Sequence, residues 1–240
     1  MGMRTVVGED QHDTARRAAH NIAALVREAV QHRGTASLAV SGGSTPGLLF
    51  DALAALDVPW GQTHVFQVDE RVAPAAHADR NLVQLQERLL ARIDIAPTHV
   101  HPIPVELSTA GDAARTYAKT IRETCGGIFD VVHLGLGDDG HTASLIPHDP
   151  VLDVATALVA TTRPYNGRRR ITLTFRALAQ ARALVWLATG QSKAEAVARL
   201  CARDQSIPAG RVRTHGAETL YIDRAANGPN APMGARRRRK

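Results

Sequence analysis

The chain has 240 residues, of which 44% are hydrophobic, so it can bury a sizeable core. Its formal net charge is +6, but the last five residues, Arg236 to Lys240, are all basic, so residues 1–235 have a net charge of only +1. We therefore expect no basic folded face for nucleic acid, and no apolar run approaches the roughly 18 residues that span a bilayer.

Two further properties bear on location. Cys125 and Cys201 are too few for a disulfide framework and lack CxxC spacing. The N-terminus has no apolar core of the kind found in signal peptides. We expect a cytoplasmic, monomeric protein with a single α/β domain over residues 1–225 and a disordered basic tail over residues 226–240.

Hydrophobic periodicity predicts strands that alternate with helices. Short apolar runs predict buried strands at 5–7, 38–40, 65–68, 129–134, 157–161, 170–174, 183–188 and 218–223. Helical spacing predicts helices at 13–32, 48–56, 82–91, 110–124 and from about 191. The alternation indicates an α/β fold with a mainly parallel sheet flanked by helices. We expect residues 100–104 to form a loop, with His99 and His101 as no more than a surface pair.

A polar loop, Ser41-Gly-Gly-Ser-Thr-Pro46, joins the second expected strand to a helix. Gly42 and Gly43 permit a tight turn, and Ser44 or Thr45 can cap the helix. Because a helix N-terminus has free N–H groups and a positive dipole end, we expect the loop to bind a phosphate. The alternative is a capped helix start without a ligand. The loop is not a Walker A motif, since no Gly-Lys-Ser/Thr follows.

Charged residues follow the third expected strand as Asp69-Glu-Arg71. Charges at the end of a buried strand lose solvation unless partners or solvent meet them. We expect Asp69 to contact a substrate. Arg71 either balances charge on a reacting oxygen or binds the substrate, and a surface salt-bridge cluster is the alternative.

Lys193 is unusual because arginine occupies 26 of the 29 basic positions. A lysine in the first turn of a helix also opposes the dipole preference for acids there. A compact ammonium beside helix N-terminal amides is typical of an anion site. The alternative is an exposed lysine that pairs with Glu195.

The stretch Phe129 to Pro147 combines a buried strand with a glycine-rich turn that contains Asp138, Asp139 and His141. The turn matches G-x-G-x-x-G, but two carboxylates would repel a pyrophosphate, and no acid follows about 20 residues on to bind a ribose. A carboxylate near an imidazole fixes its tautomer and raises its basicity. We therefore expect His141 to be a general base oriented by Asp139. The alternative is a turn in which the aspartates only bind backbone N–H groups.

These motifs, in this order, resemble the 6-phosphogluconolactonase family, in the superfamily that includes glucosamine-6-phosphate deaminase. The resemblance extends from about residue 10 to residue 223. It implies a fold similar to ribose-phosphate isomerase and CoA transferases, and hydrolysis of 6-phospho-D-glucono-1,5-lactone in the oxidative pentose phosphate pathway. It implies no metal and no organic cofactor. The expected partner is a small phosphosugar lactone, with no nucleic acid and no membrane.

The resemblance also suggests roles for the residues. His141 would activate water, with Asp139 and Arg71 beside it, and the phosphate would bind the loop 42–45 and Lys193, helped by Arg170 or another arginine of the turn 163–170. The sequence contains no G-x-S-x-G elbow, so we do not expect a covalent serine mechanism.

Two rival functions are less favoured. The deaminases have an added glutamate after the histidine, whereas Thr142 to Ile146 here contains no acid. A sugar-phosphate sensor with this fold would have a DNA-binding domain, and nothing before Thr35 resembles a helix-turn-helix. The chain also departs from the family pattern: Arg80 replaces the usual serine, the loop 164–167 lacks consecutive prolines, and the basic tail is additional.

Overall fold

The computed structural model describes residues 2–228, and the predicted basic run at 236–240 lies outside them. Its main sheet has seven strands in the order β1-β10-β9-β6-β2-β3-β5, and every neighbouring pair is parallel. The strands of this sheet are β1 (Arg4–Gly8), β2 (Ala36–Val40), β3 (Thr63–Gln67), β5 (Val100–His101), β6 (Val131–Gly135), β9 (Ala183–Ala188) and β10 (Ala217–Asp223). The predicted parallel α/β fold is confirmed.

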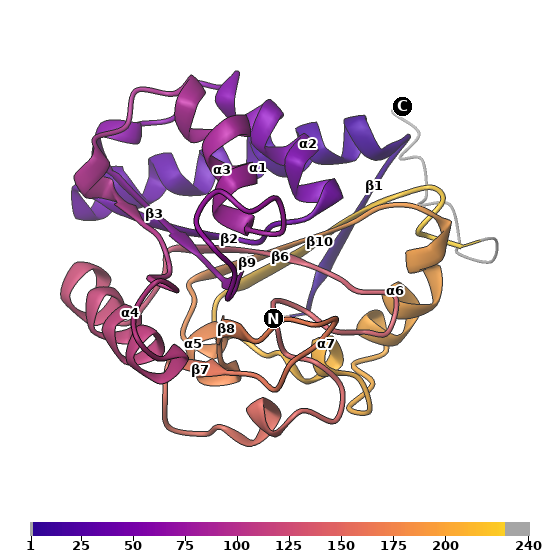
Figure 1. Ribbon diagram of the computed structural model, residues 1–240. Coiled ribbons are helices and arrows are strands. Elements are labelled where there is room, and N and C mark those ends of the chain that lie inside the picture. The colour runs from indigo at the N-terminus through magenta and orange to yellow at the C-terminus, as the bar shows by residue number, and fades with distance from the viewer. Residues whose placement is uncertain (1, 229–240) are drawn as a thin grey trace, which may run out of the picture.

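Helices cover both faces of this sheet (Figure 1). One face is packed by α1 (Gln11–Arg33), α2 (Ser44–Ala54) and α3 (Asn81–Arg88), and the other by α4 (Ala110–Cys125), α5 (Phe175–Ala179), α6 (Ala194–Cys201) and α7 (Pro208–Arg211). Side chains alternate between the two cores along each strand, as Leu38 and Val40 pack with the α1 side and Ala39 with the opposite side. The sheet is therefore buried on both faces, which explains its continuous apolar runs.

The ends of α1 follow from its sequence. Asp10 caps the first turn by accepting a hydrogen bond of 2.8 Å from the Asp13 N–H, and Gly34 ends the helix with a φ of 80°. The predicted helix and its glycine stop are both confirmed.

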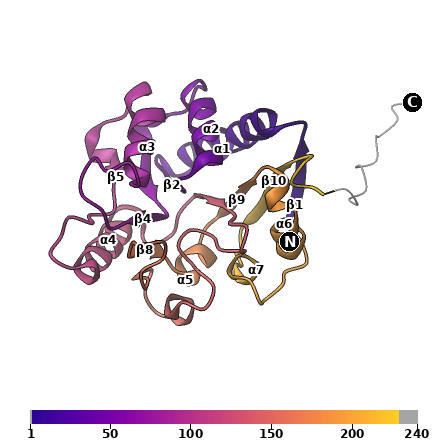
Figure 2. The same cartoon turned by 45° about the vertical axis from the view of Figure 1, so that its right-hand side comes forward.

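A second, small antiparallel sheet differs from the sequence-based expectation. Its order is β4-β8-β7, from β4 (Asp69–Arg71), β8 (Arg170–Leu173) and β7 (Val159–Thr161). Asp69 to Arg71 is thus a strand and not a loop, because the chain leaves the main sheet at Val68, whose carbonyl accepts a hydrogen bond from Leu173 N–H. In Figure 2 this sheet lies near α4, on the face opposite α1 and α2.

The expectation of a loop at residues 100–104 is also wrong at its start. Val100 and His101 form β5, the edge strand beside β3, which is too short to show a hydrophobic period. His101 is half-buried, stacks on Phe66 with ring centroids 4.4 Å apart, and lies 2.9 Å from the His64 ring nitrogen. Burial lowers the pKa of His101 to about 4, with a smaller effect from His64.

The chain order reverses between β2 and β6, in the middle of the sheet. From β2 the chain proceeds to β3 and β5 on one side, and from β6 to β9 and β10 on the other. In open α/β sheets, ligands bind outside the carboxyl ends of the strands at such a switch point. None of the described helices is long and apolar enough to cross a bilayer.

Candidate active site

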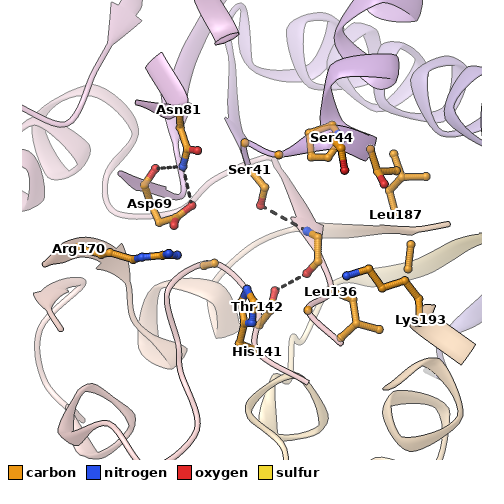
Figure 3. Close-up of a pocket in the computed structure, with 18 of the residues that line it drawn as sticks. Ser41, Ser44, Asp69, Asn81, Leu136, His141, Thr142, Arg170, Leu187 and Lys193 are labelled. Carbon is orange, nitrogen blue, oxygen red and sulfur yellow. Dashed lines mark hydrogen bonds between the residues drawn. The ribbon is translucent and has the colours of Figure 1, made fainter. Parts of the chain in front are cut away.

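A cavity of about 190 Å³ lies at this switch point, at the carboxyl ends of β2, β6 and β9. Nine of the ten predicted site residues line it: Gly42, Gly43, Ser44, Thr45, Asp69, Arg71, His141, Arg170 and Lys193. The tenth, Asp139, contacts His141 without lining the cavity. Figure 3 shows Arg170 and Asp69 at one end of the cavity and Lys193 at the other, with His141 between them.

The glycine-rich turn after β6 places a histidine against a carboxylate. Nδ1 of His141 lies 2.6 Å from Oδ1 of Asp139, and the His141 backbone N–H donates to the same oxygen at 3.1 Å. Gly137 is required here, because a Cβ at that position would lie 2.1 Å from His141 Nδ1. The pair therefore exists only because this turn has no side chain beneath the imidazole.

The electrostatics of the pair favour a charged carboxylate. Burial alone would raise the pKa of Asp139, but the His141 backbone N–H and the His141 ring outweigh it, so the pKa lies below its usual value. An ionised Asp139 accepts a hydrogen bond from the Nδ1–H group of a neutral imidazole. The tautomer with a lone pair on Nε2 is then favoured, as a general base needs.

The loop after β2 leads directly into α2, and its capping differs from the expectation. Gly43, with a φ of 126°, is the N-cap residue, so neither Ser44 nor Thr45 caps the helix. Thr45 instead shares a hydrogen bond of 3.1 Å with the Thr189 hydroxyl after β9. Gly43 has no side chain that could cap the first turn of α2, and this turn lies at the cavity.

Sequence reasoning missed two residues of α3 that hold this loop and Asp69. The Gln84 amide accepts from Gly43 N–H at 2.9 Å and donates to the Gly43 carbonyl at 2.8 Å. Asn81 donates to the Asp69 carboxylate at 3.2 Å, and the Ser144 hydroxyl donates to its other oxygen at 2.5 Å. These two hydrogen bonds hold the buried Asp69 carboxylate in place and compensate for its lost hydration. Neither amide stands out in the sequence, because α3 begins at Asn81, well after Arg71.

Two arginines lie side by side on neighbouring strands of the small sheet. Arg71 on β4 pairs in register with Arg170 on β8, and both line the cavity. Each has a buried Nε that finds no hydrogen-bond partner among the described residues. Burial lowers the pKa of Arg170, against the opposing effect of Asp69, and the Arg71 charge adds to that lowering. An anionic group between the two guanidinium groups would accept hydrogen bonds from them and would offset the repulsion between their charges.

Lys193 is the last residue of a short 3₁₀ turn, Gln191–Lys193, and immediately precedes α6, so it does not lie inside the helix. Its ammonium is 2.5 Å from Oδ1 of Asp138, so the predicted alternative of a pair with Glu195 is wrong. The Lys193 side chain is 23% exposed and that of Asp138 is 61% exposed. The aspartate can therefore swing into solvent and leave the ammonium to a ligand.

Residues 2–228 contain no grouping of three or more His, Cys, Asp or Glu side chains suited to hold a metal ion. The segment Thr142 to Ile146 contains no acidic residue and supplies no carboxylate to the site. Within it, Thr142 donates to the Gly135 carbonyl and Leu145 is buried in the core.

Known proteins resemble this chain in both sequence and fold. The family model for glucosamine-6-phosphate isomerases/6-phosphogluconolactonase matches residues 9–221. A 6-phosphogluconolactonase from Synechocystis is 36% identical over 210 residues, 84% of this chain and 87% of that protein. The human GDH/6PGL endoplasmic bifunctional protein is 35% identical over 218 residues, 85% of this chain and 28% of that protein.

A solved structure agrees with these sequence matches. The 6-phosphogluconolactonase from Thermotoga maritima superposes with a TM-score of 0.84 at 27% identity, over 92% of this chain and 99% of that one. The chain therefore belongs to the glucosamine-6-phosphate isomerase/6-phosphogluconolactonase family.

Proposed function

We propose that this protein hydrolyses 6-phospho-D-glucono-1,5-lactone to 6-phospho-D-gluconate, in the oxidative pentose phosphate pathway. The observation that supports it most is one cavity that is lined by His141, which Asp139 contacts, and also by the first turn of α2 and by Lys193. The Synechocystis and Thermotoga relatives are both named 6-phosphogluconolactonase.

The proposed reaction begins with water. Nε2 of His141 removes a proton while the water oxygen attacks the lactone carbonyl carbon. The carbonyl oxygen becomes negative, and Arg71 with Arg170 balances that charge from the adjacent strands. When the tetrahedral intermediate collapses, the bond from this carbon to the ring oxygen breaks. His141 returns its proton to the ring oxygen, which becomes a hydroxyl group, and the new carboxyl group loses its proton to solvent. Asp139 stays ionised throughout.

We assign the phosphate to the opposite end of the cavity. The first-turn N–H groups of α2 and the hydroxyl group of Ser44 can donate to phosphate oxygens, and Lys193 adds a positive charge. Asp69, held by Asn81 and Ser144, can accept hydrogen bonds from sugar hydroxyl groups at the end of the cavity away from Lys193. Binding of the phosphate would thus place the lactone carbonyl at His141.

Location and oligomeric state stay predictions. We propose a cytoplasmic monomer whose single domain spans residues 1–225, which contains the matched range 9–221. One human relative is named as an endoplasmic protein, so fractionation of cells and size-exclusion chromatography are the direct tests.

The activity test generates the lactone in situ and follows its disappearance with and without protein, since the lactone also hydrolyses spontaneously. A catalysed rate that saturates with lactone supports the proposal, and a rate equal to the spontaneous one contradicts it. Because the family description names two activities, ammonia release from glucosamine 6-phosphate is measured in parallel. Release of ammonia without lactone hydrolysis would favour the deaminase instead.

A further inference from the structure

The loop between β7 and β8 places the side chain of Tyr165 against the His141–Asp139 pair, outside the cavity lining. The Tyr165 hydroxyl donates to Oδ2 of Asp139 at 3.3 Å, while Oδ1 of the same carboxylate contacts His141. The Tyr165 ring lies edge-on to the imidazole, with centroids 6.1 Å apart and planes at 62°. One residue therefore contacts both members of the pair without lining the cavity.

The face of the same ring holds an arginine of the cavity. The guanidinium carbon of Arg170 lies 5.0 Å from the centroid of the Tyr165 ring, a distance typical of a cation–π contact. Since Nε of Arg170 is buried without a hydrogen-bond partner among the described residues, the ring is a main support of this side chain.

The loop itself is held in one conformation. Tyr165 and Arg168 exchange backbone hydrogen bonds of 2.8 and 3.2 Å, and Asn166 and Gly167 between them have φ values of 49° and 75°. Two consecutive positive φ angles are typical of the tight type I′ hairpin, which Asn-Gly favours. Arg168 further anchors the hairpin by donating to the Asp79 carboxylate at 3.2 Å.

We propose that Tyr165 is a positioning residue of the active site, in which the hydroxyl group fixes Asp139 against His141 and the ring fixes Arg170. This inference rests on the proposed function for its kinetic consequences, although the contacts themselves do not. The charged and titratable groups that face Tyr165 are Asp139, His141 and Arg170.

Two substitutions separate the two contacts. Tyr165→Phe keeps the ring and removes one neutral donor to a carboxylate, so kcat falls about 3- to 10-fold with KM unchanged. Tyr165→Leu also removes the ring face that supports Arg170, and because Arg170 balances charge that develops on the carbonyl oxygen, kcat falls further, by about 2- to 10-fold. The matched control is Tyr221→Phe, a buried tyrosine that does not line the cavity, and it leaves both constants unchanged.

A readout independent of catalysis completes the test. The titration of the Asp139 carboxyl carbon is followed by NMR, with Asp139→Asn to assign the signal. Tyr165→Phe raises the titration midpoint, because the carboxylate loses a donor that stabilises its charge. Wild-type kinetics together with an unshifted Asp139 titration in Tyr165→Phe would overturn the role of the hydroxyl group. A kcat in Tyr165→Leu equal to that of Tyr165→Phe would overturn the role of the ring. If the wild-type protein fails to hydrolyse the lactone, the proposed function fails, while the NMR titration still decides whether Tyr165 holds Asp139.

Discussion

Replacement of Lys193 by methionine tests the phosphate end of the cavity. Methionine keeps most of the side-chain length but removes the charge and the hydrogen-bond donors. A hydrogen bond to a charged group contributes about 1.5–3 kcal/mol, which corresponds to a rise of about 10- to 150-fold in KM for the phosphorylated lactone. We expect kcat to change little, because the phosphate is bound equally in the ground state and the transition state. Initial rates are measured over a range of lactone concentrations, with the spontaneous rate subtracted.

The chain offers a matched control for this variant. Lys119 is the other lysine in the described part of the chain, it is 72% exposed on α4, and it lies 3.7 Å from Glu123. Lys119→Met should leave KM and kcat unchanged. The reasoning also requires that Lys193→Met leave the hydrolysis of unphosphorylated glucono-1,5-lactone unaffected. An unchanged KM with a large loss in kcat would place Lys193 at the chemistry and refute its phosphate role.

Three further predictions concern the other end of the site and the core. His141→Asn should lower kcat by about 100-fold or more while the substrate still binds, and near-normal turnover would remove His141 from the mechanism. Gly137→Ala should reduce kcat to a similar extent, because its Cβ would lie 2.1 Å from His141 Nδ1, whereas Gly61→Ala meets open space and should have no effect. His133, fully buried in β6, has its pKa lowered by desolvation to about 3. In the unfolded chain the His133 imidazole takes up a proton near pH 6.5, whereas in the folded chain it does so only near pH 3. The free energy of unfolding is therefore highest above pH 6.5 and decreases as the pH falls from 6.5 towards 3. Urea unfolding should show about 2 kcal/mol less stability from this residue at pH 5 than at pH 8, and His133→Leu should lose less over the same range.

The sequence predicted the elements of the main sheet and the motifs at their ends well. The central strands β2, β3, β6 and β9 are buried on both faces, so their apolar runs and the helical spacing between the runs are unambiguous, whereas the short edge strand β5 was not predicted. Because parallel strands end at one edge, residues as distant as Ser44 and Lys193 could be expected in one cavity, and both line it.

The parts that sequence reasoning missed depend on contacts between distant segments. The three residues of β4 show no period, and they form a strand only because β8 lies beside them. Gln84 and Asn81 reach the site from a helix whose apolar face gives no hint of it. Tyr165 lies in a basic turn, and only the hairpin at Asn166 and Gly167 brings its hydroxyl group to Asp139.

The proposed mechanism depends on where the substrate lies, with its phosphate at the Lys193 end of the cavity and its lactone carbonyl at His141. A crystal structure with bound 6-phospho-D-gluconate tests it most directly. We expect phosphate oxygens on the first-turn N–H groups of α2 and on Lys193, and the product carboxylate within hydrogen-bond distance of His141 Nε2 and near Arg71. A phosphate bound between Arg71 and Arg170, with the carboxylate remote from His141, would contradict it.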